Sequence, residues 1–107
     1  MIQREHLMTG TVGRQVDRVE AHRVRLEPGQ QSGAHHHPGG VAGYVVEGTI
    51  KYQAEGEKPQ ELTEGSTFFE PAGKTITNFD NVSTEEPATF IAYYLLTGQQ
   101  ELIVHDS

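Results

Sequence analysis

The chain has 107 residues, which suits one small domain spanning residues 1–107 and leaves no room for a second core. Eight basic and 15 acidic residues give a formal net charge of −7, and an acidic chain without a basic run is poorly suited to nucleic acid. The absence of cysteine excludes disulfides, thiolate metal sites and thiol catalysis.

The first ten residues, MIQREHLMTG, lack the apolar stretch of a secretory signal peptide. No window of the sequence approaches the roughly 20 apolar residues of a membrane-spanning helix. We therefore expect a cytoplasmic protein without a membrane partner.

Short strands separated by glycine and proline are predicted from the start of the chain onward. Residues 17–26 (DRVEAHRVRL) form the first one. Within residues 44–54, Ile50, Tyr52 and Ala54 recur at every second position with polar residues between them. That alternation is typical of a half-buried strand.

Three further strands are predicted in the second half of the chain. Residues 66–73 (STFFEPAG) form a short strand that ends in a proline-glycine turn. Residues 88–96 (ATFIAYYLL) form a buried strand, although run length alone does not exclude a helix, and residues 101–104 (ELIV) form an edge strand. Many short strands without an amphipathic helix predict an all-β sandwich or barrel.

The stretch GAHHHPGG places three histidines inside a spaced pattern. Gly29 is followed by five residues and then by His35 and His37, with one residue between them. Val41 comes after three more residues, and Gly48 after a further six. Because residues i and i+2 of a strand share a face, both histidines are predicted to point inward and the middle histidine outward.

A second pattern follows. Gly65 is separated by five residues from Pro71-Ala72-Gly73. Ile76 comes after two more residues, and Asp80 after a further three. The two patterns together resemble the two motifs of the cupin family, whose members are jelly-roll barrels built as a double-stranded β-helix. The resemblance covers about residues 22–96 and implies a small cupin barrel, with the motif glycines at its turns.

The resemblance also implies where metal ligands would lie. In a typical cupin, two histidines and a glutamate of the first motif and a histidine of the second hold a divalent metal. Here His35 and His37 occupy the histidine positions, whereas Val41 and Ile76 stand at the other two. Two imidazoles alone make a weak site, so the metal site is predicted to be degenerate. If a metal binds there, we expect a divalent transition metal: Fe, Mn, Ni, Cu or Zn.

Other polar residues are predicted to help bind a ligand. Asn78 shares the face of Ile76 if their strand is regular, but it could equally belong to a polar turn at residues 77–81. Tyr44 and Gln53 are further predicted ligand-binding residues, although the sequence does not orient them.

Three functions are compatible with the sequence. The first is a barrel pocket that binds a small organic molecule, such as an aromatic or carboxylic metabolite, with His35 and His37 as polar groups. The second is a divalent-metal-dependent cupin enzyme of the dioxygenase, isomerase or lyase type that uses the same two histidines. The third is a structural or interaction module that forms a homodimer through sheet packing. We expect a homodimer for all three functions.

Overall fold

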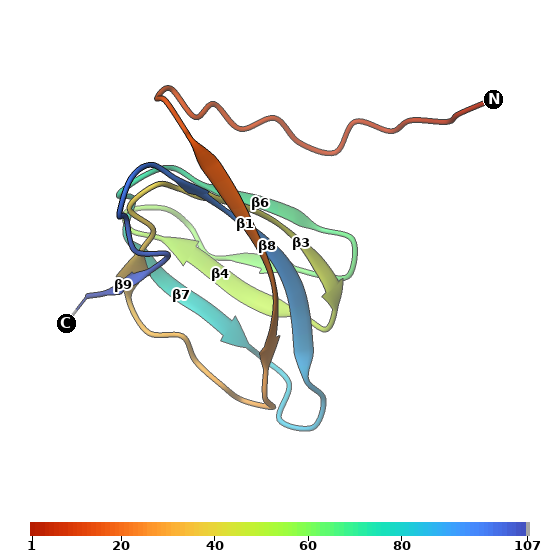
Figure 1. Ribbon diagram of the computed structural model, residues 1–107. Helices are drawn as coiled ribbons and strands as arrows, with labels where there is room; N and C mark the ends of the chain where they lie inside the picture. The colour runs from red at the N-terminus through yellow and green to blue at the C-terminus, as the bar shows by residue number, and fades with distance from the viewer. Residues whose placement is uncertain (107) are drawn as a thin grey trace.

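The computed structural model describes residues 1–106, and its regular elements are all strands (Figure 1). The alternating patterns and turn residues therefore predicted the fold class correctly. In chain order the strands of this described part are β1 (Arg18–Leu26), β2 (His35–His36), β3 (Val41–Glu47), β4 (Ile50–Ala54), β5 (Gln60–Leu62), β6 (Thr67–Glu70), β7 (Ile76–Asn81), β8 (Ala88–Leu96) and β9 (Val104–His105).

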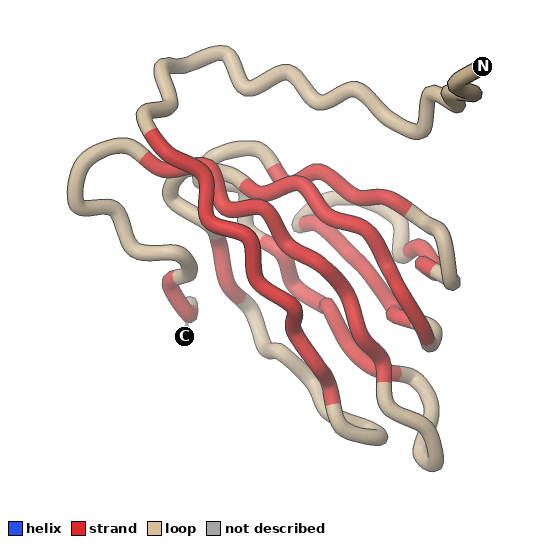
Figure 2. The backbone as a smooth tube through the Cα atoms, turned by 45° about the vertical axis from the view of Figure 1, so that its right-hand side comes forward, coloured by secondary structure: helices blue, strands red, loops and turns tan. Residues whose placement is uncertain are grey.

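The strands form two sheets that face each other as layers (Figure 2). One sheet has the order β1-β8-β3-β6 and the other has the order β5-β4-β7-β2-β9. Neighbouring strands pair antiparallel. The four glycines of the sequence patterns have φ values between 72° and 88°, so they provide the corners that other residues resist: Gly29, Gly48, Gly65 and Gly73.

The core lies between the sheets and follows from the period-two patterns. Along β8, every second residue from Ala88 to Leu96 is buried. The rings of Phe68, Phe79 and Phe90 meet edge to face, with centroids 4.8 to 5.9 Å apart. Aromatic rings in this arrangement fill one region of the interior efficiently, and polar side chains are gathered in another.

Strand register decides which polar side chains meet. In the second sheet, His35 of β2 lies opposite Ile76 of β7 on one side and His105 of β9 on the other. In the first sheet, Val41 of β3 lies opposite Glu70 of β6. Both facing pairs contribute buried residues to the same interior.

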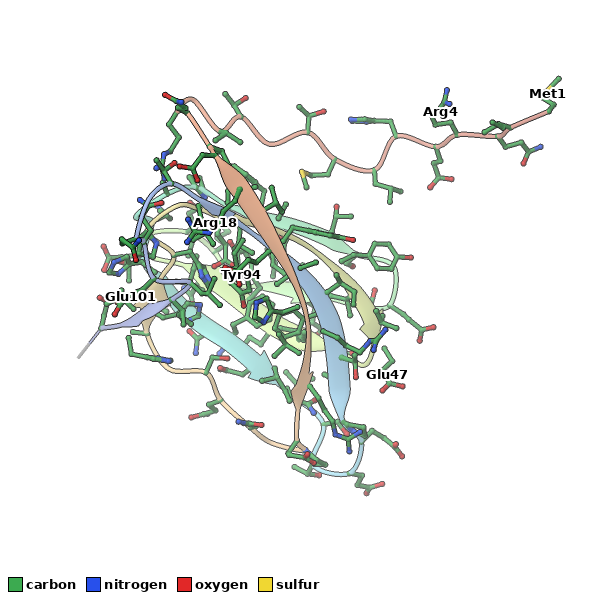
Figure 3. All side chains as sticks on the ribbon, viewed as in Figure 1. Met1, Arg4, Arg18, Glu47, Tyr94 and Glu101 are labelled. Carbon is green, nitrogen blue, oxygen red and sulfur yellow. The ribbon has the colours of Figure 1, made fainter. Side chains whose placement is uncertain are left out.

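The chain before β1 is an extended arm, which we define as residues 1–12 (Figure 3). Its backbone crosses the outer face of β6, where a methyl group on Gly10 would lie only 2.4 Å from the Phe69 ring. Beyond that point most of its side chains are exposed, and Met1 and Arg4 project away from the sheets (Figure 3).

Candidate metal centre

His35 and His37 enter the interior from β2 and from the residue that follows it. Both are buried, with 3% and 5% of their surface exposed. The Nδ1–H of His35 donates to the Gly33 carbonyl and that of His37 to the Leu102 carbonyl, each at 2.8 Å. A carbonyl only accepts, so these bonds place the proton on Nδ1 and leave the Nε2 lone pairs free to bind a cation.

A carboxylate from the opposite sheet faces both Nε2 atoms. Glu70 is the last residue of β6 and only 1% exposed. Its Oε1 lies 3.3 Å from Nε2 of His37 and 3.8 Å from Nε2 of His35. That oxygen is buried without a hydrogen-bond partner in the described structure. A buried oxygen of this kind is costly unless a cation or proton joins it.

The three side chains fit a divalent transition metal. One ligand atom from each of His35, His37 and Glu70 lies within 4.8 Å of the others. Ligand atoms about 2.1 Å from a metal, at tetrahedral or octahedral angles, are separated by roughly 3.0–3.4 Å. The His37–Glu70 separation of 3.3 Å lies within this range, and the His35–Glu70 separation of 3.8 Å is close to it. Two histidines and one carboxylate form the ligand set that leaves positions open in many metalloenzymes.

Burial adjusts the protonation of the surrounding groups. Desolvation lowers the pKa of His35, against the opposing effects of the Gly33 hydrogen bond and the Glu70 charge. The neutral, metal-binding form is therefore favoured. Desolvation, reinforced by the Glu70 charge, raises the pKa values of Tyr52 and Tyr94, so both phenols stay protonated at neutral pH.

The histidines and the glutamate open onto a cavity of about 100 Å³ between the sheets. Tyr94, whose ring centroid lies 5.4 Å from that of His37, borders it and lies between the layers (Figure 3). The other lining residues are mostly apolar: Val24, Leu26, Ser32, Val41, Phe68, Phe79, Phe90, Ala92 and Ile103. A mostly apolar cavity with a few convergent polar groups is typical of a small-ligand site.

The structure places the other predicted ligand-binding residues away from this cavity. Tyr44 is on the outer face of β3 and is 40% exposed. Gln53 donates its side-chain amide to the Glu57 carbonyl. Asn78 donates to Asp80 Oδ2 at 3.0 Å.

A bulge explains the position of Asn78. It lies in strand β7 rather than in a turn, but the register shifts so that Thr77 is the unpaired residue between Ile76 and Asn78. Ile76 and Phe79 therefore both point into the core, and Asn78 is on the opposite face.

The predicted orientation of the first motif agrees with the structure. His35 and His37 are buried together, whereas His36 points away and its Nδ1 lies 3.1 Å from Asp106. Val41 and Ile76, which stand at the two apolar motif positions, are also buried.

The motif positions supply two candidate ligands, and sequence reasoning missed Glu70 as the third candidate. It stands directly before Pro71, outside the positions that the motifs assign to ligands. A signal for it was present, since in TFFE the period-two alternation puts Glu70 on the face of Phe68. The sequence could not predict that Glu70 lies opposite Val41 of β3, because that depends on pairing between distant strands.

The family-model comparison matches the cupin domain over residues 22–94. The chain belongs to the cupin family. No protein with a curated description matches this cupin. Within residues 1–106, no helix is long and apolar enough to cross a membrane.

Solved structures similar to this cupin include enzymes. The DMSP lyase DddQ from Ruegeria pomeroyi DSS-3 is 20% identical with a TM-score of 0.68, over 81% of this chain and 42% of that one. An uncharacterised double-stranded β-helix protein from Klebsiella pneumoniae is 21% identical (TM-score 0.66), over 80% and 72%.

An oxalate oxidase in complex with the substrate analogue glycolate is 26% identical with a TM-score of 0.64, over 80% of this chain and 45% of that one. The cupin therefore spans less than half the length of the two named enzymes. Likenesses at this level support the shared fold.

Proposed function

We propose that this cupin binds a divalent transition metal through His35, His37 and Glu70 and uses it to bind and transform a small carboxylic or hydroxylated molecule. The observation that carries the proposal is the buried, unpartnered Oε1 of Glu70 facing the Nε2 atoms of both histidines. A metal cation satisfies all three groups at once, which neither an empty nor an apolar pocket does.

The chain's own residues define the conditions of the reaction. A bound metal of this kind acts as a Lewis acid with positions open to an oxygen ligand. The apolar lining limits water in the cavity, and the Tyr94 phenol, which borders the cavity and stays protonated, is available as a hydrogen-bond donor. The hydrogen bonds to the Gly33 and Leu102 carbonyls hold each imidazole in one orientation.

The cavity size favours a compact substrate. A cavity of about 100 Å³ is smaller than the roughly 300–1,000 Å³ of pockets that hold drug-sized ligands, so it favours a molecule of a few heavy atoms. The oxalate oxidase that resembles this cupin was solved with glycolate, which is a molecule of that class. Oxalate and glycolate are therefore suitable first probes.

The proposal is tested by metal content and affinity. We expect the tag-free protein, stripped and reloaded with Mn²⁺, Fe²⁺, Co²⁺, Ni²⁺, Cu²⁺ or Zn²⁺, to bind about one ion per chain. Glu70→Gln and the His35→Ala/His37→Ala double variant should lose that ion, whereas Glu85→Gln, which changes an exposed carboxylate, should keep it.

A different result would favour metal-free ligand binding, with His35 and His37 as the polar groups. It would consist of wild-type protein without metal under all loading conditions, together with a thermal shift caused by oxalate or glycolate that disappears in His37→Ala. That outcome would overturn the metal proposal.

We also propose that the protein forms a homodimer through the outer face of the β1-β8-β3-β6 sheet. Four large apolar side chains exposed on this face come from three adjacent strands: Val19, Tyr44, Val46 and Tyr93. Ala21, Tyr93 and Ala42 align as one row across these three strands. Contiguous apolar surface of this kind is typical of an interface.

The charges on the face suit a second copy of the same chain. Arg25 of β1 and Glu47 of β3 lie in the same row, with Thr89 of β8 between them. A two-fold axis parallel to the strands above β8 brings β1 of one copy over β3 of the other. Arg25 then faces Glu47 twice across the interface.

Sedimentation tests this arrangement. Tyr93→Glu should give a monomer, whereas Val82→Glu, at an equally exposed position outside the face, should not change the mass. Arg25→Glu and Glu47→Arg should each weaken the dimer, and their combination should restore it. A monomeric wild-type protein, or a combination weaker than either single variant, contradicts the proposed dimer.

A further inference from the structure

We infer that residues 99–106, here called the C-terminal strap, position His37 and close the metal site, so that metal exchanges when the strap leaves β2. The inference rests on the proposed metal function but concerns a segment outside the matched cupin domain, which ends at residue 94. In Figure 1 the chain turns back after β8 and returns to the barrel as β9.

The strap contacts a metal ligand directly. The Leu102 carbonyl accepts the Nδ1–H of His37 at 2.8 Å. This bond fixes the tautomer and ring orientation that aim Nε2 at Glu70. The corresponding bond of His35 is made by Gly33, in the loop before β2, so the strap holds one candidate ligand and that loop holds the other.

The strap is also a wall of the cavity. Ile103 lines the cavity beside the two histidines, and Leu102 packs against the core. Removing these side chains would open the apolar cavity to solvent, which weakens the exclusion of water from the ligand positions. The same segment therefore orients a ligand and limits access to it.

The attachment of the strap is short compared with the sheets. β9 pairs with β2 over two residues, His35 opposite His105 and His36 opposite Val104. The Asp106 N–H donates to the Ala34 carbonyl at 2.8 Å, and the Asp106 carboxylate lies 3.1 Å from Nδ1 of His36. By contrast, β1 and β8 pair over nine residues. A short edge pairing opens at a lower free energy than the barrel unfolds.

A reversible disulfide tests the inference in a chain that has no cysteine of its own. The β2–β9 register places Ala34 opposite Asp106. Paired antiparallel residues have Cα separations of about 4.5–5.5 Å, which lie within the range of a disulfide. The Ala34→Cys/Asp106→Cys variant, loaded with Co²⁺, is mixed with excess EDTA, and metal loss is followed with the disulfide oxidised and then reduced.

We expect the oxidised protein to lose metal at least tenfold more slowly than the same protein after reduction. The rate of the reduced protein should not change with low concentrations of urea, because local opening exposes little surface. Asp106→Ala, which lacks the disulfide, serves as the control for loss of the His36 contact and should show no effect of oxidant.

Two other results bear on the inference differently. Equal rates in the oxidised and reduced states, with metal bound in both, overturn the strap and leave the metal site intact. Wild-type protein that binds no Co²⁺ overturns the proposed function itself.

Discussion

Glu70 and Val41 lie opposite each other on β6 and β3, and both side chains are buried. Directly opposed residues on one face of a sheet have Cβ atoms about 4.5–5.5 Å apart. A carboxylate at either position therefore reaches nearly the same part of the cavity. The carboxylate of the proposed metal site therefore comes from the neighbouring strand instead of from the motif position.

This opposition predicts that the ligand can be moved. Glu70→Val should lower metal affinity at least about 100-fold, because lost supporting contacts alone cost 10–100-fold. Val41→Glu added to Glu70→Val should recover much of that loss. Isothermal titration with Zn²⁺ measures both steps. Failure of the double variant to regain affinity, while it remains folded by circular dichroism, would show that position 41 does not reach the ligands.

The burial of the Tyr52 phenol leads us to expect a loss of stability at alkaline pH. Its buried phenol has a pKa raised by desolvation and by the charges of Glu70 and Glu57. Above pH 10 the unfolded chain releases this proton while the folded chain keeps it, so the free energy of unfolding falls as pH rises.

Urea unfolding between about pH 9 and pH 11 measures this effect. Tyr52→Phe should flatten the decline, whereas Tyr44→Phe, which changes an exposed phenol, should not. An unchanged slope in Tyr52→Phe would contradict the assignment.

Sequence could predict the inward direction of His35 and His37 because that depends only on local alternation. It could not predict that Glu70 faces them, because this requires the pairing of β3 with β6 and the distance between the two sheets. The pairing of distant strands is set by the whole core, so spacing within one motif does not contain it.

Between β2 and β3 the chain approaches β8 closely. A Cβ on Gly39 would lie 1.6 Å from the Leu95 carbonyl oxygen, and the next residue, Gly40, accepts a hydrogen bond from the Leu95 N–H. Because the obstacle is backbone, the substitution cannot be relieved by a side-chain rotation. This turn connects the histidine strand directly to β3.

Gly39→Ala is accordingly predicted to destabilise the protein by several kcal/mol and to disturb the metal site. Gly29→Ala is the matched control, since its φ of +72° is unfavourable but its Cβ position is open. That control should cost only about 1–2 kcal/mol. Urea unfolding compares the two, and equal costs would show that the approach to Leu95 is relaxed in solution.

The elements show where sequence patterns stop being sufficient. Alternation predicted β4 well, because Lys51 and Gln53 alternate with buried apolar residues, whereas β8 was predicted from its apolar run rich in β-branched and aromatic residues. It misplaced the face of Asn78, because the extra residue in β7 shifts the alternation. The edge strand predicted at residues 101–104 lies at residues 104–105 as β9, where pairing with β2 determines its position.

Metal binding should stabilise the whole molecule, since its ligands come from both sheets. The two histidines lie at β2 in one sheet and Glu70 lies on β6 in the other. An ion at 100 times its dissociation constant adds about 2.7 kcal/mol to the free energy of unfolding. Differential scanning calorimetry with and without Zn²⁺ should show the rise in wild type and not in Glu70→Gln. The same rise in both proteins would place the stabilising ion elsewhere.

The opposition of Val41 and Glu70 also bears on how such a site can change during evolution. A chain with glutamate at both positions would retain a metal ligand whichever one later mutated. The carboxylate could therefore pass from one strand to its neighbour without a stage that lacks it. Relatives with the same chemistry would then differ at position 41, and a search for that single residue would divide them into separate groups.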